Sequence, residues 1–201
     1  MNLVIIKYNA GNIQSVLYAL DRIGVSAKVT DDIAEIQHAD KVIFPGVGEA
    51  SSAMKYLKER ELDVVIRNLK QPVLGICLGM QLMCRFSEEN NVDCLNIFDE
   101  DVKYFGKAVN ADNRLKIPQI GWNNIYDLKS RLFDNVPQNS YAYFVHSYYA
   151  ALGEHTIATT DYIIPYSAAL HKNNFYGAQF HPEKSAGVGE QILKNFVQLI
   201  N

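Results

Sequence analysis

The sequence has few cysteines, a single tryptophan and no long apolar run. Its 201 residues include three cysteines, Cys77, Cys84 and Cys94, an odd number without any CxxC spacing. This pattern argues against a disulfide framework or a zinc site and suits a reducing compartment. No segment approaches the roughly 18 apolar residues that cross a bilayer. We therefore expect no membrane-spanning helix and no bound metal.

Blocks of basic charge are also missing. The chain has 19 Lys and Arg against 22 Asp and Glu, a formal net charge of −3, and its basic residues are spread singly. A nucleic-acid partner, which needs clustered basic side chains, is not expected. The apolar run at residues 3–6 is closed by Lys7 and is too short for a secretory signal. These features predict a cytoplasmic protein that binds neither nucleic acid nor membrane.

Repeats, low-complexity segments and Pro/Gly/Ser-rich linkers are absent, so residues 1–201 are predicted to form one domain. The first half alternates strand-like apolar runs with amphipathic helical segments. Strands are expected at 3–7, 26–30, 41–46 and 72–76, and helices at 11–24 and 49–70. This alternation predicts a parallel sheet covered by helices on both faces.

Beyond residue 92 the pattern changes. Short β-rich segments, "NNIYDL", "YAYFVHSYYA", "HTIATT" and "FYGAQF", are separated by Asn, Asp, Gly and Pro, and the chain ends in a helical pattern at 187–200. The predicted fold class is α/β, a single three-layer domain. Its central sheet is mixed but mostly parallel, is flanked by helices and carries strand-rich insertions.

A cysteine on a tight corner is the first sign of chemistry. In "LGICLGMQ", Cys77 lies between a predicted strand and a helix expected at 78–85, and Gly75 and Gly79 flank it at two residues on either side. In open α/β sheets, functional groups collect where strands end and helices begin. The pattern is typical of a nucleophile elbow, and the helix N-terminus favours a thiolate. The alternative, a buried structural cysteine, fits Cys84 and Cys94 better.

A cysteine nucleophile needs a base, and the base needs a group that orients it. Of the five histidines, His181 in "GAQFHPEKS" is the best candidate, whereas His146 in "YFVHSYY" is compatible with a satisfied core histidine. On a strand, His181 and Glu183 would point to the same side, although a surface His–Glu pair would look the same. We predict a triad of Cys77, His181 and Glu183.

The loop "FPGVGEA" follows the strand at 41–46. It is not a P-loop, because no Gly-Lys-Ser/Thr follows, and its glycines could be simple turn residues. Attack on an acyl carbon creates an oxyanion that needs backbone N–H donors. We expect one donor from Leu78, next after the nucleophile, and a second from the peptide of Gly46 and Val47.

Together, "PGVG", "GICLGMQ" and "QFHPEKS" resemble the three motifs of the class I, or triad-type, glutamine amidotransferases, which have a flavodoxin-like fold. The resemblance extends from "AGN" near residue 10 to the final helix. Within this family, "PGVGEA", Met80 after "GICLG", "IPQIGWN", "YFVHSYY" and "HPEKS" are most similar to the glutaminase branch that serves imidazole glycerol phosphate synthase.

The resemblance implies roles for individual residues. Cys77 would attack the side-chain amide of L-glutamine, His181 would shuttle the proton, and Glu183 would orient the imidazole. No cofactor is implied. The residues that would hold the amino acid are Gly48, Gln81, Glu89, Ser147 and Tyr148.

The family also implies a partner, a (β/α)8-barrel cyclase subunit that uses the ammonia to form imidazole glycerol phosphate in histidine biosynthesis. Ammonia released into neutral water is mostly protonated and no longer nucleophilic, so a covered passage between two subunits would preserve it. The residues that fall where the family contacts its partner are Asn12, Trp122, Tyr143 and Lys184. In "KYNAGN", however, Lys7 and Asn9 replace the usual Asp and Gly.

Three other functions remain open at this point. The departure at Lys7 and Asn9 is compatible with a glutaminase of the same type that serves another synthase, such as one that aminates a sugar or cofactor precursor. A cysteine hydrolase or peptidase could use the same sheet and elbow. A catalytically silent binding domain is the fourth possibility, and an intact triad argues against it.

Overall fold

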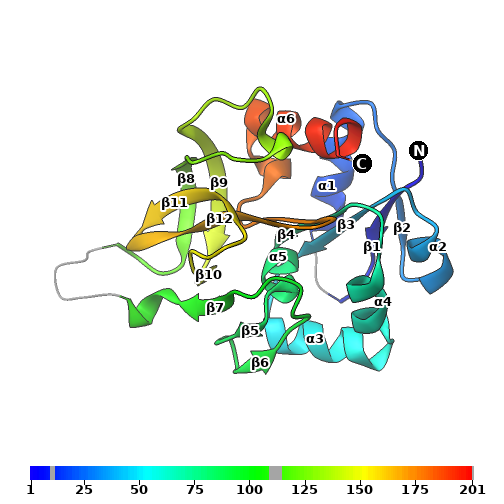
Figure 1. Cartoon of the computed structure of the whole chain (residues 1–201), viewed down its shortest axis with the longest axis horizontal. Helices are drawn as coiled ribbons and strands as arrows, with labels where there is room; N and C mark the ends of the chain where they lie inside the picture. Colours follow the sequence, from blue (N-terminus) through cyan, green and yellow to red (C-terminus); the bar gives the residue numbers. More distant parts are fainter. Residues whose placement is uncertain (10–11, 109–114, 201) are drawn as a thin grey trace.

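The computed structural model describes residues 1–9, 12–108 and 115–200. Its main sheet contains seven strands: β1 (Leu3–Ile6), β2 (Lys28–Thr30), β3 (Lys41–Gly46), β4 (Val73–Cys77), β11 (Thr156–Tyr162), β12 (Ile164–Lys172) and β13 (Phe175–Ala178). Their order is β11-β12-β13-β4-β3-β1-β2 (Figure 1). The strands from β13 to β2 pair in parallel, whereas β12 and β11 extend the sheet in antiparallel.

The parallel strands at the centre are buried along their whole length. Every residue of β1, β3 and β4 is buried. These strands read as continuous apolar runs because helices cover both faces of the sheet, so neither face needs polar side chains. The C-terminal ends of β3 and β4 therefore form a rigid edge on which a site can be built.

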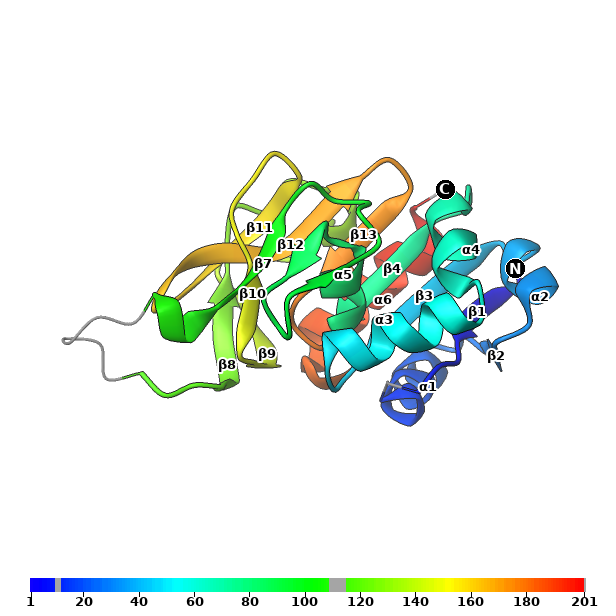
Figure 2. The same ribbon diagram turned by 90° about the horizontal axis from the view of Figure 1, so that it is seen from below.

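Helices form the two outer layers of the molecule (Figures 1 and 2). One apolar layer combines the sheet with α1 (Ile13–Arg22) and α6 (Ala186–Gln198). The opposite layer combines it with α2 (Ile33–Gln37), α3 (Ala50–Glu59), α4 (Leu62–Asn68) and α5 (Leu78–Met83). None of the described helices is long and apolar enough to span a membrane.

The strand-rich part of the chain adds two small sheets beside the edge that carries β11 and β12 (Figure 2). One is the antiparallel pair β8 (Gln119–Ile125) and β9 (Ser140–His146). The other has the order β10-β7-β5-β6, from β5 (Phe86–Ser87), β6 (Val92–Asp93), β7 (Asp101–Tyr104) and β10 (Tyr148–Ala150). Short 3-10 turns lie at Phe105–Lys107, Arg131–Phe133 and Pro182–Lys184.

The predicted α/β architecture, with a mixed, mostly parallel sheet between helices, is confirmed. Three details were wrong. The helix expected at 49–70 is broken at Glu61, which adopts a left-handed φ of 59°. The helix after Cys77 ends at Met83 and does not reach residue 85. β12, the longest strand, was not predicted, because Pro165 near its start reads as a strand breaker.

Candidate active site

Cys77 sits on a strained corner between β4 and α5. Its backbone has φ 53° and ψ −111°, a conformation that non-glycine residues rarely adopt. The corner is possible because α5 packs directly on the sheet. A Cβ on Gly79 would lie 1.9 Å from the carbonyl oxygen of Phe44, and one on Gly75 would lie 2.9 Å from backbone atoms of α5. The two flanking glycines are therefore required by close backbone approach.

His181 and Glu183 form a buried pair next to the corner. The His181 Nδ1 lies 2.8 Å from the Glu183 Oε1, and both residues are buried. The contact does not arise from strand alternation, as the sequence suggested: β13 ends at Ala178, and Glu183 lies in the 3-10 turn Pro182–Lys184. The proline starts this turn, which folds the carboxylate back onto the ring.

The electrostatics of His181 favour its charged form. Burial alone lowers the pKa of His181, but side-chain hydrogen bonds to Cys77 and to Glu183, together with the negative charges of both partners, raise it to about 10. An imidazolium beside the sulfur favours a thiolate in turn. The three side chains can therefore exchange a proton within one connected group.

The glycine loop lies directly beside the nucleophile. Gly46 ends β3 and is the register partner of Cys77 at the end of β4. A Cβ on Gly46 would lie 2.7 Å from the backbone nitrogen of Gly79, so the loop and α5 are in close contact. Gly48 has φ +106°. Gly46 therefore lies close to both Cys77 and Leu78.

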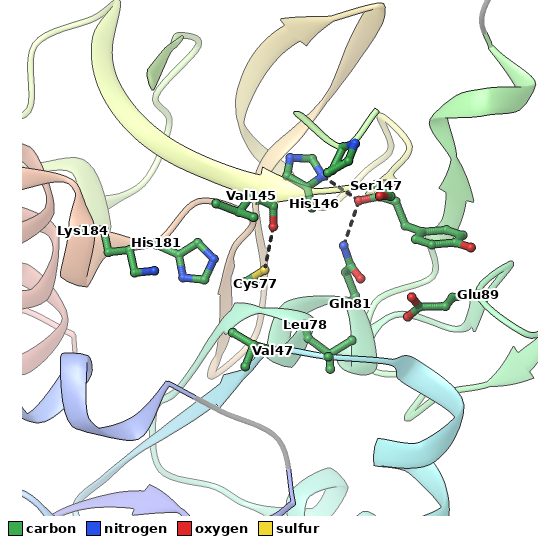
Figure 3. Close-up of a pocket in the computed structure, with 13 residues that line it drawn as sticks. Val47, Cys77, Leu78, Gln81, Glu89, Val145, His146, Ser147, His181 and Lys184 are labelled. Carbon is green, nitrogen blue, oxygen red and sulfur yellow. Dashed lines mark hydrogen bonds between the residues drawn. The ribbon is translucent and has the colours of Figure 1, made fainter. Parts of the chain in front are cut away.

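A cavity of about 330 Å³ opens at Cys77 (Figure 3). Its walls come from the loop after β3, the corner between β4 and α5, the 145–148 segment and the Pro182–Lys184 turn. The lining residues are Val47, Gly48, Cys77, Leu78, Gln81, Glu89, Pro118, Val145, His146, Ser147, Tyr148, His181 and Lys184. All five residues expected to hold the substrate are among them. Gly46 and Glu183 lie behind this wall, along a narrow crevice that Asn12 also lines.

Two polar side chains at the far end of the cavity are held by the protein. The Gln81 Nε2 donates to the Tyr148 carbonyl oxygen and to the Gln179 Oε1, each at 2.9 Å. Both amide hydrogens are thus used, and Gln81 offers its amide oxygen to a ligand. Glu89 accepts a hydrogen bond from the Ala50 N–H at 2.7 Å, and burial raises the pKa of Glu89 despite this bond.

Sequence reasoning missed one polar group beside the cavity, Gln179, and left open whether His146 is a core histidine. Gln179 is fully buried and donates to the Cys77 Sγ at 3.8 Å. His146 is a satisfied core histidine, with Nδ1 2.7 Å from the Tyr148 carbonyl oxygen and Nε2 3.0 Å from the Tyr166 hydroxyl. Burial lowers the pKa of His146 to about 4. Among the described residues, no group of three or more His, Cys, Asp or Glu is placed to hold a metal ion.

The residues expected at a partner interface gather around the turn Pro182–Lys184. This turn contacts both α1 and β9. Trp122 on β8 and Tyr143 on β9 are register partners, and their rings meet edge to face at 5.8 Å. Trp122 is 52% exposed, so it lies outside the core. Asn12 precedes α1. Residues 10–11, part of the "AGN" resemblance, lie outside the described residues.

A thiol at a strand–helix corner, a buried imidazole–carboxylate pair and a glycine loop beside them define a cysteine-nucleophile enzyme on a flavodoxin-like sheet. The family model described as glutamine amidotransferase class-I matches residues 4–199. The chain belongs to the class-I glutamine amidotransferase family.

Within that family, the chain is similar to imidazole glycerol phosphate synthase subunit HisH of several bacteria. It is 60% identical to that of Bacteroides fragilis over 199 residues, which cover 99% of this chain and 100% of the relative. It is 57% identical to that of Bacteroides thetaiotaomicron, with the same coverage. Over 202 residues it is 48% identical to that of Haemophilus influenzae, covering 100% of this chain and 98% of the relative.

Solved structures share the fold. PurLQS from Thermotoga maritima superimposes with a TM-score of 0.70 at 12% identity, covering 100% of this chain and 99% of the other. A glutamine amidotransferase from the same organism gives a TM-score of 0.61 at 17% identity, covering 98% and 82%. At these identities the likeness concerns the three-layer architecture alone.

Proposed function

We propose that this chain is the glutaminase subunit of an imidazole glycerol phosphate synthase. It hydrolyses L-glutamine to glutamate and ammonia and passes the ammonia to a cyclase subunit in histidine biosynthesis. The observation that carries the proposal is the buried pair of His181 and Glu183, with His181 and Cys77 lining the same cavity. The 60% identity to a named subunit over the full chain supports the choice of synthase.

The first half of the reaction forms a thioester. The Cys77 Sγ attacks the side-chain amide carbon of glutamine, and the carbonyl oxygen becomes an oxyanion. We assign the N–H of Leu78 and the peptide of Gly46 and Val47 as the donors to this oxyanion. His181, already protonated beside the thiolate, gives its proton to the leaving nitrogen, which departs as ammonia while a γ-glutamyl thioester remains on Cys77.

The second half of the reaction restores the enzyme. His181, now neutral, removes a proton from a water molecule, and the resulting hydroxide attacks the thioester carbonyl. Glutamate leaves, and the sulfur regains its starting state. Throughout both halves Glu183 accepts the hydrogen bond from the His181 Nδ1. This bond fixes the ring so that Nε2 faces the sulfur and the substrate.

Substrate selection is assigned to the far end of the cavity. The Gln81 oxygen and the Glu89 carboxylate are acceptors and suit the α-ammonium group of the amino acid. Ser147 and Tyr148 are the candidates for its α-carboxylate, and Gly48 leaves room for the side chain. A cavity of about 330 Å³ is large enough for one amino acid.

The partner in this proposal is a (β/α)8-barrel cyclase that covers the cavity mouth. Asn12, Trp122 and Tyr143 lie near the turn that holds Glu183 and Lys184, and Trp122 offers an exposed aromatic anchor. Docking there would shield ammonia from protonation. The three unpaired cysteines suit the cytoplasm, where such a partner would be made.

The test is a glutaminase assay on the purified chain, alone and with a candidate cyclase. Glutamate release that requires Cys77 and rises when the cyclase is added is the expected result. Recovery from cells of a different synthase as the bound partner would favour the alternative motivated by Lys7 and Asn9. Faster cleavage of γ-glutamyl peptides than of glutamine would instead indicate a hydrolase.

A further inference from the structure

A chain of hydrogen bonds runs from the far end of the cavity to the nucleophile. It begins at the backbone carbonyl of Tyr148, passes through the side-chain amides of Gln81 and Gln179, and ends at the Cys77 sulfur (Figure 3 labels Gln81 and Cys77). The distances are 2.9, 2.9 and 3.8 Å. The chain joins residues on β10, α5 and β4 through Gln179, which directly follows β13.

The orientation of each amide in this chain follows from its neighbours. A backbone carbonyl oxygen only accepts hydrogen bonds, so the Gln81 atom that faces the Tyr148 oxygen is its nitrogen. That nitrogen also faces Gln179, so the facing Gln179 atom is its oxygen. The amide nitrogen of Gln179 is then the atom that points at the Cys77 Sγ. The hydrogen-bond network therefore requires Gln179 to present an N–H donor to the Cys77 sulfur.

The sulfur meets a second polar neighbour of the opposite kind. The carbonyl oxygen of Val145 lies 3.8 Å from the Cys77 Sγ and accepts the proton of the thiol form. When that proton leaves for His181, the Val145 oxygen faces a negative sulfur and repels it. The Gln179 N–H is the amide donor on the sulfur, and it attracts the thiolate more strongly than the thiol.

Gln179 has no exposed surface and lies behind the cavity wall. A fully buried amide loses its hydration, so it is retained at low cost only where both of its ends are paired. Here one end holds Gln81, a residue of the cavity wall, and the other holds the nucleophile.

We propose that Gln179 is a further residue of the glutaminase machinery, and this inference rests on the proposed function. Its amide N–H donates to the Cys77 Sγ, offsets the Val145 carbonyl and favours the thiolate. Its amide oxygen fixes the Gln81 amide so that the Gln81 oxygen faces the cavity. Gln179 thereby links the group that recognises the substrate's α-ammonium to the atom that attacks its side chain.

The test measures how fast iodoacetamide alkylates Cys77 between pH 5 and pH 10, by mass spectrometry of the peptide that contains it. Gln179→Glu keeps the shape but replaces the donor with a carboxylate oxygen, and Gln179→Met removes the donor. Both should move the pH midpoint of alkylation upward. For Gln179→Glu we expect a shift of about one pH unit and a roughly tenfold slower reaction at pH 7.

Gln71→Met is the matched control. The Gln71 side chain donates to the Ile36 carbonyl at the opposite end of β4, away from the sulfur, so its alkylation midpoint should equal that of the wild type. The proposal is overturned if both Gln179 variants fold and their pH midpoints of alkylation equal that of the wild type. Alkylation needs no glutamine, so the two claims can fail separately. If the chain did not hydrolyse glutamine, the proposed function would be contradicted, but the alkylation measurement would still test the role of Gln179.

A second measurement needs no substitution at Gln179. In the wild-type chain, the side-chain N–H resonances of Gln179 should shift as Cys77 titrates, because the hydrogen bond strengthens with charge on the sulfur. The same resonances should be pH-independent in Cys77→Ser. Resonances of Gln179 that do not respond to pH in the wild type would overturn the proposal even if the Gln179 variants fail to fold.

Discussion

Gly79 lies against the Phe44 carbonyl so closely that a Cβ at position 79 would be 1.9 Å from the oxygen. The contact holds α5 on the end of β3 and so sets the corner at Cys77. Gly79→Ala should force the helix away from the sheet, lowering the free energy of unfolding by about 2–3 kcal/mol and reducing activity at least tenfold. Chemical denaturation and the glutaminase assay measure the two effects.

Gly187→Ala is the control for that prediction. Gly187 lies in α6, and a Cβ there would meet nothing within 4 Å. Alanine is the better helix former, so this variant should be more stable by up to about 1 kcal/mol with unchanged activity. Equal stability of the two variants would show that the approach of α5 to β3 is looser than described.

Removing the Tyr8 hydroxyl is expected to stabilise the protein. It is buried, and its hydroxyl has no hydrogen-bond partner among the described residues. Burial, together with the nearby Cys77, raises the pKa of Tyr8. Tyr8→Phe removes an unsatisfied group and should raise the free energy of unfolding by about 1 kcal/mol, as thermal denaturation will detect.

Tyr166→Phe provides the comparison. The Tyr166 hydroxyl contacts the Gln119 Oε1 at 2.7 Å and the His146 Nε2 at 3.0 Å. Removing it takes a hydrogen bond from each of these two buried atoms, so the free energy of unfolding should fall by about 1–3 kcal/mol. If Tyr8→Phe destabilised the chain as much as Tyr166→Phe does, the Tyr8 hydroxyl would have a partner after all.

Glu183→Gln should slow glutamine turnover by about 10²–10⁴ and leave KM nearly unchanged. The amide keeps the size of the side chain but removes the charge that orients and stabilises the His181 imidazolium. Steady-state kinetics measure the split between kcat and KM. Glu190→Gln breaks the exposed ion pair with Arg22 and should keep the wild-type kcat. A similar loss of kcat in both variants would contradict the role of Glu183 in orienting His181.

The two buried histidines predict how stability depends on pH. The pKa of His181 is raised from 6.5 to about 10, so its contribution is fully present below pH 6.5 and is lost as the pH rises toward 10. The pKa of His146 is lowered to about 4, so its contribution is present above pH 6.5 and is lost as the pH falls toward 4. Tm should therefore be highest near pH 6.5.

His146→Gln isolates the acid side of this profile. The variant should show a smaller change of Tm between pH 6.5 and pH 4.5 than the wild type, because no buried imidazole has to be charged. The exposed His38→Gln should retain the wild-type slope. An unaltered slope in His146→Gln would contradict the assignment of the acid limb to this histidine.

The corner and the sheet could be predicted from sequence because glycine spacing and apolar runs carry local information. Gly75 and Gly79 mark a close approach of backbones whatever the partner strand is. The contact of His181 with Glu183 was also predicted, but from strand alternation, and a 3-10 turn produces it. Pro182, which the sequence suggested only ends a strand, also starts that turn.

Other features had no local signal. The break at Glu61 needs a left-handed residue that the sequence does not mark with glycine or asparagine. β12 was missed because Pro165 hides a strand whose pairing is decided by its neighbours. Gln179 stands in an apolar run, and its place between Cys77 and Gln81 exists only once β13, β4 and α5 are assembled.

The central claim is that Cys77 liberates ammonia from glutamine for a second active site. The most direct test compares Cys77→Ala with the wild type in complex with the cyclase, once with glutamine and once with ammonium salt at alkaline pH. We expect the variant to lose product formation from glutamine and to retain it from ammonia. Product formation from glutamine near the wild-type rate in Cys77→Ala would contradict the account.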